Sequence, residues 1–252
     1  MPSIPDVWEE YALFFHTEEG TVFPHDHPEM EFYRRIRSEY PGDCLEIGAG
    51  SGRLAESLFS RGLTVALEPS SNMLSLWSPD ASFLAERVRG MGQAMPFRDE
   101  SFGFACFPYN GLQCVLDRGC RRSILSEAYR ILAFGGVFLF EVSPSFERRP
   151  EEPRTIRYRA PLPDRRFLTL SERVFRSSEG NAVVYDMIYT TEGFGSAEKR
   201  RVVLEMSTFP VMEAVEDGTD QGFSIVNLWG DYDLSSFDPQ LSPRLLVLAK
   251  KE

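Results

Sequence analysis

Short apolar runs alternate with amphipathic segments between residue 43 and about residue 143. This pattern is typical of strands that crossover helices join into a parallel sheet, because the helices bury both faces of every strand. The clearest strand signals are Cys44–Ile47, Thr64–Leu67, Phe104–Phe107 and Val137–Val142, and a weaker one lies near Val88 and Arg89. The pattern predicts an α/β fold with a Rossmann-like, doubly wound and mostly parallel sheet.

Two helices are predicted within this part of the chain. Apolar residues at helical spacing over 124–132 indicate one helix, which we expect Gly135 and Gly136 to end. The other is expected over 72–86, with an interruption at Ser78-Pro79-Asp80.

The pattern changes after Ser143, where five prolines within twenty residues exclude a long helix. Apolar runs over 167–173, 183–189 and 201–209, separated by glycine-containing turns, predict an antiparallel β-meander inserted into the α/β domain. A short helix over 210–220, a strand over 223–228 and a last apolar strand over 245–249 then return to the core. That last strand is expected to run antiparallel to its neighbours.

These patterns divide the chain into four parts. We expect an N-terminal helical lid at 1–42, a Rossmann-like core at 43–148, the inserted antiparallel sheet at 149–209, and a return to the core at 210–252, with the last helix and strands.

Composition and charge limit the classes of partner that the chain is expected to bind. The formal net charge of −11 disfavours a nucleic-acid backbone as ligand, because that interaction needs clustered Lys and Arg. Seven arginines do gather over 148–166, but acidic residues lie among them and indicate a solvated face. The four cysteines have no C-x-x-C spacing, and no signal peptide or membrane span is recognisable. We expect a cytoplasmic protein with a small-molecule partner, no nucleic acid and no membrane.

The candidate chemistry begins at a glycine-rich turn. Gly48, Gly50 and Gly52 alternate between the first strand and a helix, where glycines let backbone N–H groups approach a ligand closely. A dinucleotide site usually has the pattern G-x-G-x-x-G, and Arg53 stands where its last glycine would fall. The turn alone is also compatible with a tight connection that binds nothing.

Three further sequence features favour a nucleoside ligand for this turn. Glu68 ends the second strand about 20 residues beyond the first glycine, where a carboxylate suits both hydroxyls of a ribose. A second loop rich in glycine covers 90–97, and the loop Phe107-Pro108-Tyr109-Asn110-Gly111 follows the fourth strand. All three lie at the carboxyl edge of the predicted sheet, where open α/β folds bind their ligands.

In this order, the motifs resemble those of the class I S-adenosylmethionine-dependent methyltransferases, in the small-molecule type with a β-insertion after the fifth strand. The resemblance covers about 32–250 and rests on Leu45–Leu54, Glu68, the segments 95–102 and 130–136, and the closing strand 242–250. Two positions depart from the family: Met91 stands where many members have Asp, and Phe134 where Pro is frequent.

The resemblance implies a set of cofactor contacts. The backbone of Gly48, Ala49, Gly50 and Gly52 would hold the methionine moiety, and Glu68 would accept from the ribose hydroxyls. Met91 and Gly92 would flank the adenine, with a backbone group or Gln93 in place of the missing Asp. Phe107 would line the methyl-donor side. The other residues that it places at the cofactor are Glu46, Pro69, Met73 and, from the lid, Tyr11.

Catalytic residues are harder to predict. Tyr109 and Asn110 follow the fourth strand directly and are expected to line the acceptor pocket. The three histidines, His16, His25 and His27, lie in the N-terminal stretch, and His27 is the third catalytic candidate, as a base. An exposed loop histidine is the alternative. His25-Asp26-His27 lacks a distant ligand, so no metal site is expected.

The sequence therefore predicts in-line methyl transfer from S-adenosylmethionine to nitrogen or oxygen of a small molecule, with S-adenosylhomocysteine as product. A binding protein of the same fold without turnover is one alternative, and a nicotinamide-dependent oxidoreductase is another. The polar side chains expected on the inserted sheet suit a substrate or a second copy of the chain.

Overall fold

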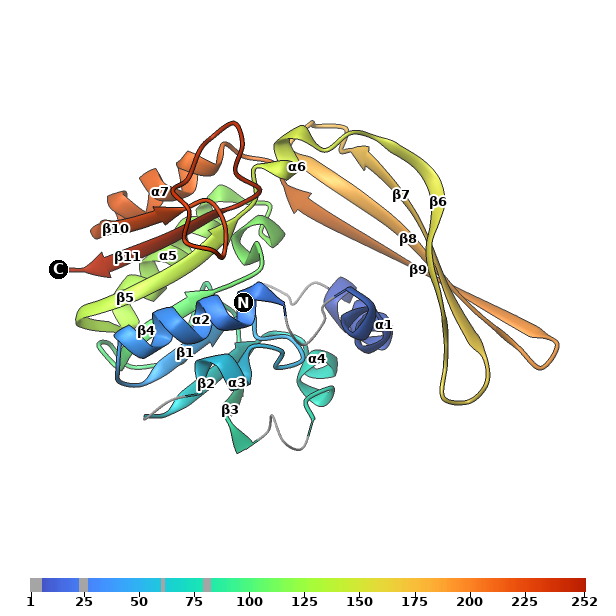
Figure 1. The fold of residues 1–252 in the computed structure, drawn as a ribbon, viewed down its shortest axis with the longest axis horizontal. Helices are drawn as coiled ribbons and strands as arrows, with labels where there is room; N and C mark the ends of the chain where they lie inside the picture. The colour runs from blue at the N-terminus through green and yellow to red at the C-terminus, as the bar shows by residue number, and fades with distance from the viewer. Residues whose placement is uncertain (1–5, 23–26, 60–61, 79–82) are drawn as a thin grey trace.

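The computed structural model describes residues 6–22, 27–59, 62–78 and 83–252. A seven-stranded sheet forms the core, in the order β10-β11-β5-β4-β1-β2-β3 (Figure 1). Its strands are β1 Cys44–Ile47, β2 Thr64–Glu68, β3 Glu86–Arg89, β4 Phe102–Phe107, β5 Leu132–Val142, β10 Phe223–Trp229 and β11 Leu245–Lys251. The strands β1 to β5 pair in parallel, and β11 joins β5 in antiparallel fashion. The predicted α/β fold is confirmed.

Helices cover both faces of this sheet. On one face α5 (Arg118–Ile131) and α7 (Val211–Asp220) pack against Phe138 and Phe140. On the other face α2 (Pro28–Glu39) and α3 (Ala55–Leu58) pack against Val137 and Leu139. Successive residues of a strand point to opposite faces, so a strand buried on both sides must be apolar at nearly every position.

A second sheet is inserted between β5 and α7. It is antiparallel, with the order β6-β7-β8-β9, and its strands are β6 Glu152–Pro161, β7 Phe167–Arg176, β8 Ala182–Gly193 and β9 Ser196–Ser207. We call it the inserted sheet. The predicted meander had three strands and missed β6, whose prolines argued against regular structure. Pro153 and Pro161 are tolerated because β6 is an edge strand, where a missing N–H breaks no ladder.

Two predicted helix boundaries were wrong. The helix expected over 72–86 is confined to α4 (Ser71–Ser75), and β3 already begins at Glu86; residues 79–82 lie outside the described residues. The residue before a proline disfavours helical backbone, which accounts for the early end. Gly135 and Gly136 do not end α5, which stops at Ile131; they lie inside β5, where Gly135 has a φ of +79°.

The first helix connects the two sheets. α1 (Asp6–Val22) lies between the core and the concave side of the inserted sheet (Figure 1). Phe14 of α1 stacks on Tyr189 of β8, with ring centroids 3.9 Å apart and planes 3° from parallel. No helix among the described residues is both long and apolar enough to cross a lipid bilayer.

Candidate active site

The glycine turn follows β1 and has left-handed backbone at each of its three glycines. Gly48, Gly50 and Gly52 have φ values of +67°, +55° and +84°. A Cβ on Gly48 would lie 2.9 Å from the Phe107 ring, and one on Gly52 would lie 2.5 Å from the Trp77 indole. A Cβ on Gly50 would meet nothing within 4 Å. Packing therefore requires two of the glycines, whereas Gly50 faces open space that a ligand can use.

Glu68 lies against this turn, as the sequence analysis expected. Its carboxylate accepts from the backbone N–H of Gly50 and from that of Ser70, both at 2.9 Å. Burial raises the pKa of Glu68, although these two hydrogen bonds act in the opposite direction. Pro69 follows directly, and Met73 is buried in α4. The structure thus brings the glycine turn and the end of β2 together around one carboxylate.

Glu9 of α1, which no local pattern in the sequence identifies, holds the loop after β2. Its carboxylate accepts from the backbone N–H groups of Ser71 and Asn72 and from the Ser70 hydroxyl, each at 2.9 Å. Ser70 in turn donates its backbone N–H to Glu68. One chain of hydrogen bonds therefore connects α1 to the carboxylate beside the glycine turn.

Replacing Glu9 by glutamine should loosen α1. Loss of the charged acceptor lowers the free energy of opening α1 by about 1–2 kcal/mol, so amide hydrogen exchange across α1 should become about tenfold faster. Exchange measured by mass spectrometry tests this, with Glu10→Gln as the matched control, because Glu10 is exposed on the same helix. Equal exchange in both variants would contradict the conclusion that the hydrogen bonds of Glu9 hold α1 on the loop after β2.

The far end of α1 is held by Glu18. Tyr11 donates to its carboxylate, and so do Tyr189 at 2.8 Å and Tyr158 at 3.4 Å. The structure therefore engages the Tyr11 hydroxyl, predicted for the cofactor, in a hydrogen bond within α1 to Glu18. Burial raises the pKa of Glu18.

A buried charged pair lies beside the turn. Arg53 donates through both terminal nitrogens to Glu29 of α2, with an Nη2–Oε1 distance of 3.0 Å, and Glu29 is fully buried. Glu46, a predicted cofactor residue in β1, is 3% exposed on the same side of the sheet. Burial raises the pKa of Glu46 from 4.5 to about 8, an effect that Arg53 partly offsets and Glu29 reinforces.

This raised pKa predicts a pH dependence of stability. Glu46 binds its proton more tightly in the folded chain than in the unfolded chain. Its contribution to the free energy of unfolding is therefore complete below about pH 4.5 and is lost as the pH rises through about 8. Glu46→Gln stays neutral, and its stability relative to the parent chain should increase between about pH 5 and about pH 8. Urea unfolding across this range measures the difference. A difference that does not vary with pH would contradict the assignment.

The loop after β4 has strained backbone. Tyr109 and Asn110 have φ values of 49° and 60°, in the left-handed region that non-glycine residues rarely adopt. The Tyr109 ring lies 5.5 Å from the Arg53 guanidinium, and desolvation raises the pKa of its phenol to about 12. The Asn110 Oδ1 is buried and has no hydrogen-bond partner within the described part of the chain. Phe107 is buried against Gly48 and Gly111.

His27 caps a helix. Its Nδ1 accepts from the backbone N–H of Glu29 at 3.3 Å, at the N-terminus of α2. That ring nitrogen is therefore engaged in the N-cap of α2. The His16 side chain and all of His25 lie outside the described residues.

The predicted adenine positions lie at the carboxyl edge. Met91 forms an isolated backbone bridge with Ala94 in the loop after β3, where Met91 is half-buried and Ala94 is exposed. A Cβ on Gly92 would lie 3.3 Å from Ile47 and from Ile124. The loop therefore packs against the end of β1, on the same edge as the glycine turn.

Glu141 of β5 supports the neighbouring wall. It accepts from the Tyr232 hydroxyl at 2.8 Å, and Arg244 lies 3.3 Å from its other oxygen. Burial raises the pKa of Glu141 to about 7, and Glu29 adds to this effect. With Tyr232 and Arg244 as partners, Glu141 is tied into the protein wall.

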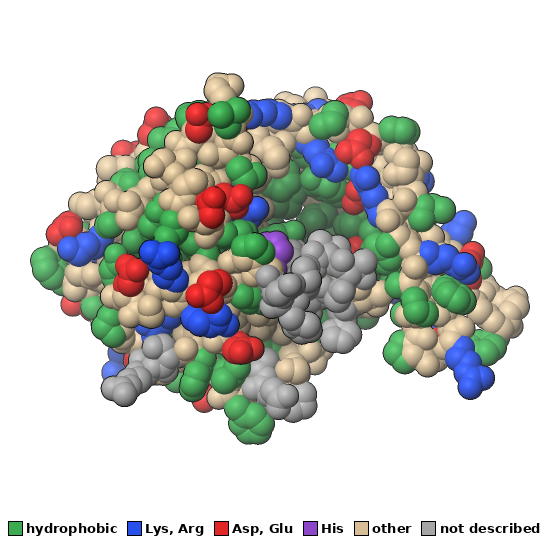
Figure 2. Space-filling view, viewed as in Figure 1, with side chains coloured by type: hydrophobic (Ala, Val, Ile, Leu, Met, Phe, Trp, Pro, Cys, Tyr) green, Lys and Arg blue, Asp and Glu red, His purple; other side chains and the backbone are tan. Residues whose placement is uncertain are grey.

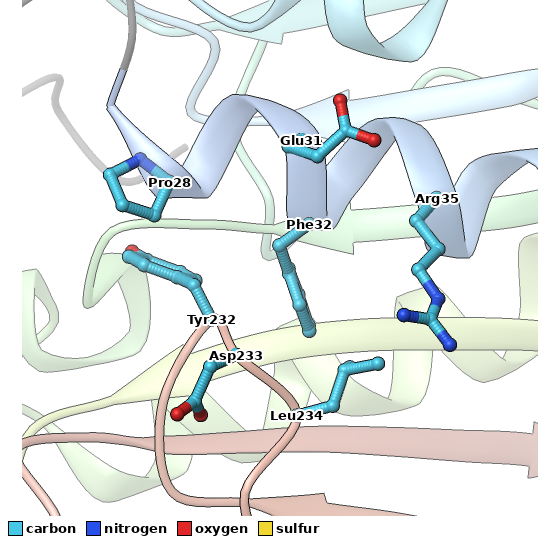
Figure 3. A pocket seen from close by; sticks show the side chains of 7 residues that line it. All are labelled: Pro28, Glu31, Phe32, Arg35, Tyr232, Asp233 and Leu234. Carbon is cyan, nitrogen blue, oxygen red and sulfur yellow. The ribbon is translucent and has the colours of Figure 1, made fainter.

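Two hollows differ in what surrounds them. Figure 2 shows a deep hollow with largely apolar walls between the core and the inserted sheet. A separate cavity of about 260 Å³ lies between α2 and the loop after β10 (Figure 3). Phe32, Tyr232 and Leu234 line that cavity, and no residue of the glycine turn does.

The sequence profile of a methyltransferase domain matches residues 45–140. This range contains the glycine turn, Glu68 and the loop after β4. No curated protein sequence is a significant match to the chain.

Solved structures resemble the chain over nearly its whole length. An S-adenosylmethionine-dependent methyltransferase from Clostridium acetobutylicum is 12% identical with a TM-score of 0.78, and the match covers 95% of this chain and 98% of that one. A sugar N-methyltransferase from Streptoalloteichus is 16% identical, with a TM-score of 0.76 and coverage of 96% and 92%. An amino pentose methyltransferase from Micromonospora echinaspora, solved with S-adenosylmethionine bound, is 16% identical, with a TM-score of 0.71 and coverage of 95% and 97%.

These likenesses show the fold, and the matched domain contains the motifs that the sequence analysis identified. The fold is that of S-adenosylmethionine-dependent methyltransferases, and residues 45–140 match the methyltransferase-domain profile.

Proposed function

We propose that this protein transfers a methyl group from S-adenosylmethionine to nitrogen or oxygen of a small molecule, with nitrogen favoured. The observation that carries the proposal is the position of the strained loop at Tyr109 and Asn110, beside the glycine turn. Two similar structures, one named an amino pentose methyltransferase and one a sugar N-methyltransferase, support a small acceptor.

The cofactor fits the described residues. Gly50 leaves open space where a side chain would stand, and Glu68 lies within hydrogen-bond distance of its N–H. Gly48, Ala49, Gly50 and Gly52 would hold the methionine end, and Glu68 the ribose. When bound, the sulfonium supplies an activated methyl group.

The reaction depends chiefly on positioning. Displacement at a methyl group needs the acceptor atom in line with the bond that breaks, and holding the two reactants in this geometry supplies much of the acceleration. Tyr109 and Asn110 would orient the acceptor, and the apolar hollow in Figure 2 would exclude water around it.

The described residues favour an amine over a hydroxyl. Tyr109 keeps its proton at neutral pH, as any phenol does, and its raised pKa of about 12 makes it a still poorer base in this range; His27 uses Nδ1 to cap α2. Neither is set up to remove a proton from a hydroxyl. An amine that binds in its neutral form already carries the lone pair that attacks, whereas an ammonium, like a hydroxyl, must first lose a proton.

A panel of amino sugars and aliphatic amines, each with its hydroxyl counterpart, tests the proposal. We expect an amine to stimulate formation of S-adenosylhomocysteine from S-adenosylmethionine above the rate without acceptor. If S-adenosylhomocysteine binds but no compound stimulates turnover, the protein is a non-catalytic binding protein instead.

The Asn110 Oδ1, buried without a hydrogen-bond partner among the described residues, predicts a contact with the acceptor. Asn110→Gly removes the amide, and glycine adopts a φ of +60° without strain. We expect the KM for the acceptor to rise about three- to tenfold, the effect of one hydrogen bond, with unchanged affinity for S-adenosylhomocysteine. Phe194→Gly is the matched control, because Phe194 has a φ of 51° in a hairpin of the inserted sheet. Equal KM values in the two variants would argue against the contact.

A further inference from the structure

Trp77 contacts two of the three glycines of the turn. Its indole N–H donates to the Gly50 carbonyl oxygen at 2.8 Å. Its ring occupies the space where a Cβ of Gly52 would stand, 2.5 Å from that position. Because Glu68 accepts from the N–H of Gly50 at 2.9 Å, the Gly50 residue is held on both sides.

The surrounding sequence leaves room for this indole. Trp77 is 6% exposed and forms a small buried cluster with Ala49, Ala55 and Ala66. These alanines come from the turn, from α3 and from β2, and their short side chains form a slot that one large ring fills. The Arg87 guanidinium lies 5.9 Å from the ring and covers it.

We propose that Trp77 is a positioning residue for cofactor binding, which fixes the glycine turn in its binding conformation before the cofactor arrives. A preorganised site loses less conformational entropy on binding than one that must order its backbone. The inference rests on the proposed binding of S-adenosylmethionine at this turn. Trp77 acts through Gly50 and Gly52.

Trp77→Phe tests the hydrogen bond, because phenylalanine keeps an aromatic ring in the slot but has no N–H. Calorimetry should show S-adenosylhomocysteine binding about three- to tenfold more weakly than in the parent chain, the range of one hydrogen bond. Trp229→Phe is the matched control, because Trp229 lies in β10, away from the turn, and packs edge-on against Phe32 of α2. The Trp229→Phe variant should bind S-adenosylhomocysteine with the affinity of the parent chain.

The outcomes separate this inference from the proposed function. If the parent chain does not bind S-adenosylhomocysteine, the proposed function fails. If the parent binds it but Trp77→Phe binds within twofold of the parent, or if Trp229→Phe weakens binding equally, the positioning role is wrong.

A second measurement does not depend on the folding of Trp77→Phe. The protein has three tryptophans, so Trp8→Phe combined with Trp229→Phe leaves Trp77 as the sole emitter. Because the indole is already seated against the turn before the cofactor arrives, its emission maximum should stay constant through saturation with S-adenosylhomocysteine, as followed by calorimetry on the same double variant. A shift of the emission maximum on saturation would overturn the inference.

Discussion

Replacing Glu68 by alanine should weaken S-adenosylhomocysteine binding by about 1–3 kcal/mol, through loss of hydrogen bonds to a charged acceptor. The carboxylate would accept from the ribose hydroxyls, and it already accepts from the backbone N–H groups of Gly50 and Ser70. Its loss therefore removes a ligand contact and frees the glycine turn. Titration calorimetry measures the effect.

Two variants sharpen this test. Glu68→Gln keeps one acceptor oxygen and should lose less affinity than Glu68→Ala. Glu198→Ala should bind as the parent chain does, because Glu198 lies exposed on β9 and pairs with Arg200. Unchanged affinity in Glu68→Ala would refute the assignment of the ribose acid.

The second large effect concerns stability. Arg53→Met should lower the free energy of unfolding by about 3–5 kcal/mol, because it leaves the Glu29 carboxylate buried without its partner. Glu29 is 0% exposed and the Arg53 side chain is 13% exposed, so water cannot readily replace the lost contact. Urea unfolding at neutral pH measures the loss.

The double variant shows whether an unpaired charge causes this loss. Glu29→Leu combined with Arg53→Met removes both charges and should recover most of the stability, because an apolar pair can replace a buried ion pair at little cost. If the double variant is as unstable as Arg53→Met, lost packing and not an uncompensated carboxylate explains the effect.

The spacing of apolar residues and the positions of glycine and proline predicted the core sheet well. Strands buried on both faces, such as β1 and β4, are short apolar runs, and no other element has that pattern in this part of the chain. The edge strand β6 has no such pattern, because one of its sides pairs with nothing and its residues are mostly exposed. The prolines of β6 also argued against a strand, so β6 was not predicted.

The site divides in the same way. Gly50 and Glu68 are recognisable because their spacing along the chain reflects the strand–turn–helix unit around them. Glu9 reaches the loop after β2, Glu29 reaches Arg53 and Trp77 reaches Gly50. Each contact comes from another element and is a tertiary contact that no local spacing records. His27 was predicted as a base because its residue type suits one, whereas its role at the N-terminus of α2 depends on the backbone of Glu29.

The most direct test of the account is calorimetric titration of the purified chain with S-adenosylhomocysteine and, separately, with nicotinamide dinucleotides. We predict saturable binding of S-adenosylhomocysteine at one site per chain, weakened in Glu68→Ala, and no binding of the dinucleotides. Tight dinucleotide binding without a response to S-adenosylhomocysteine would contradict the account.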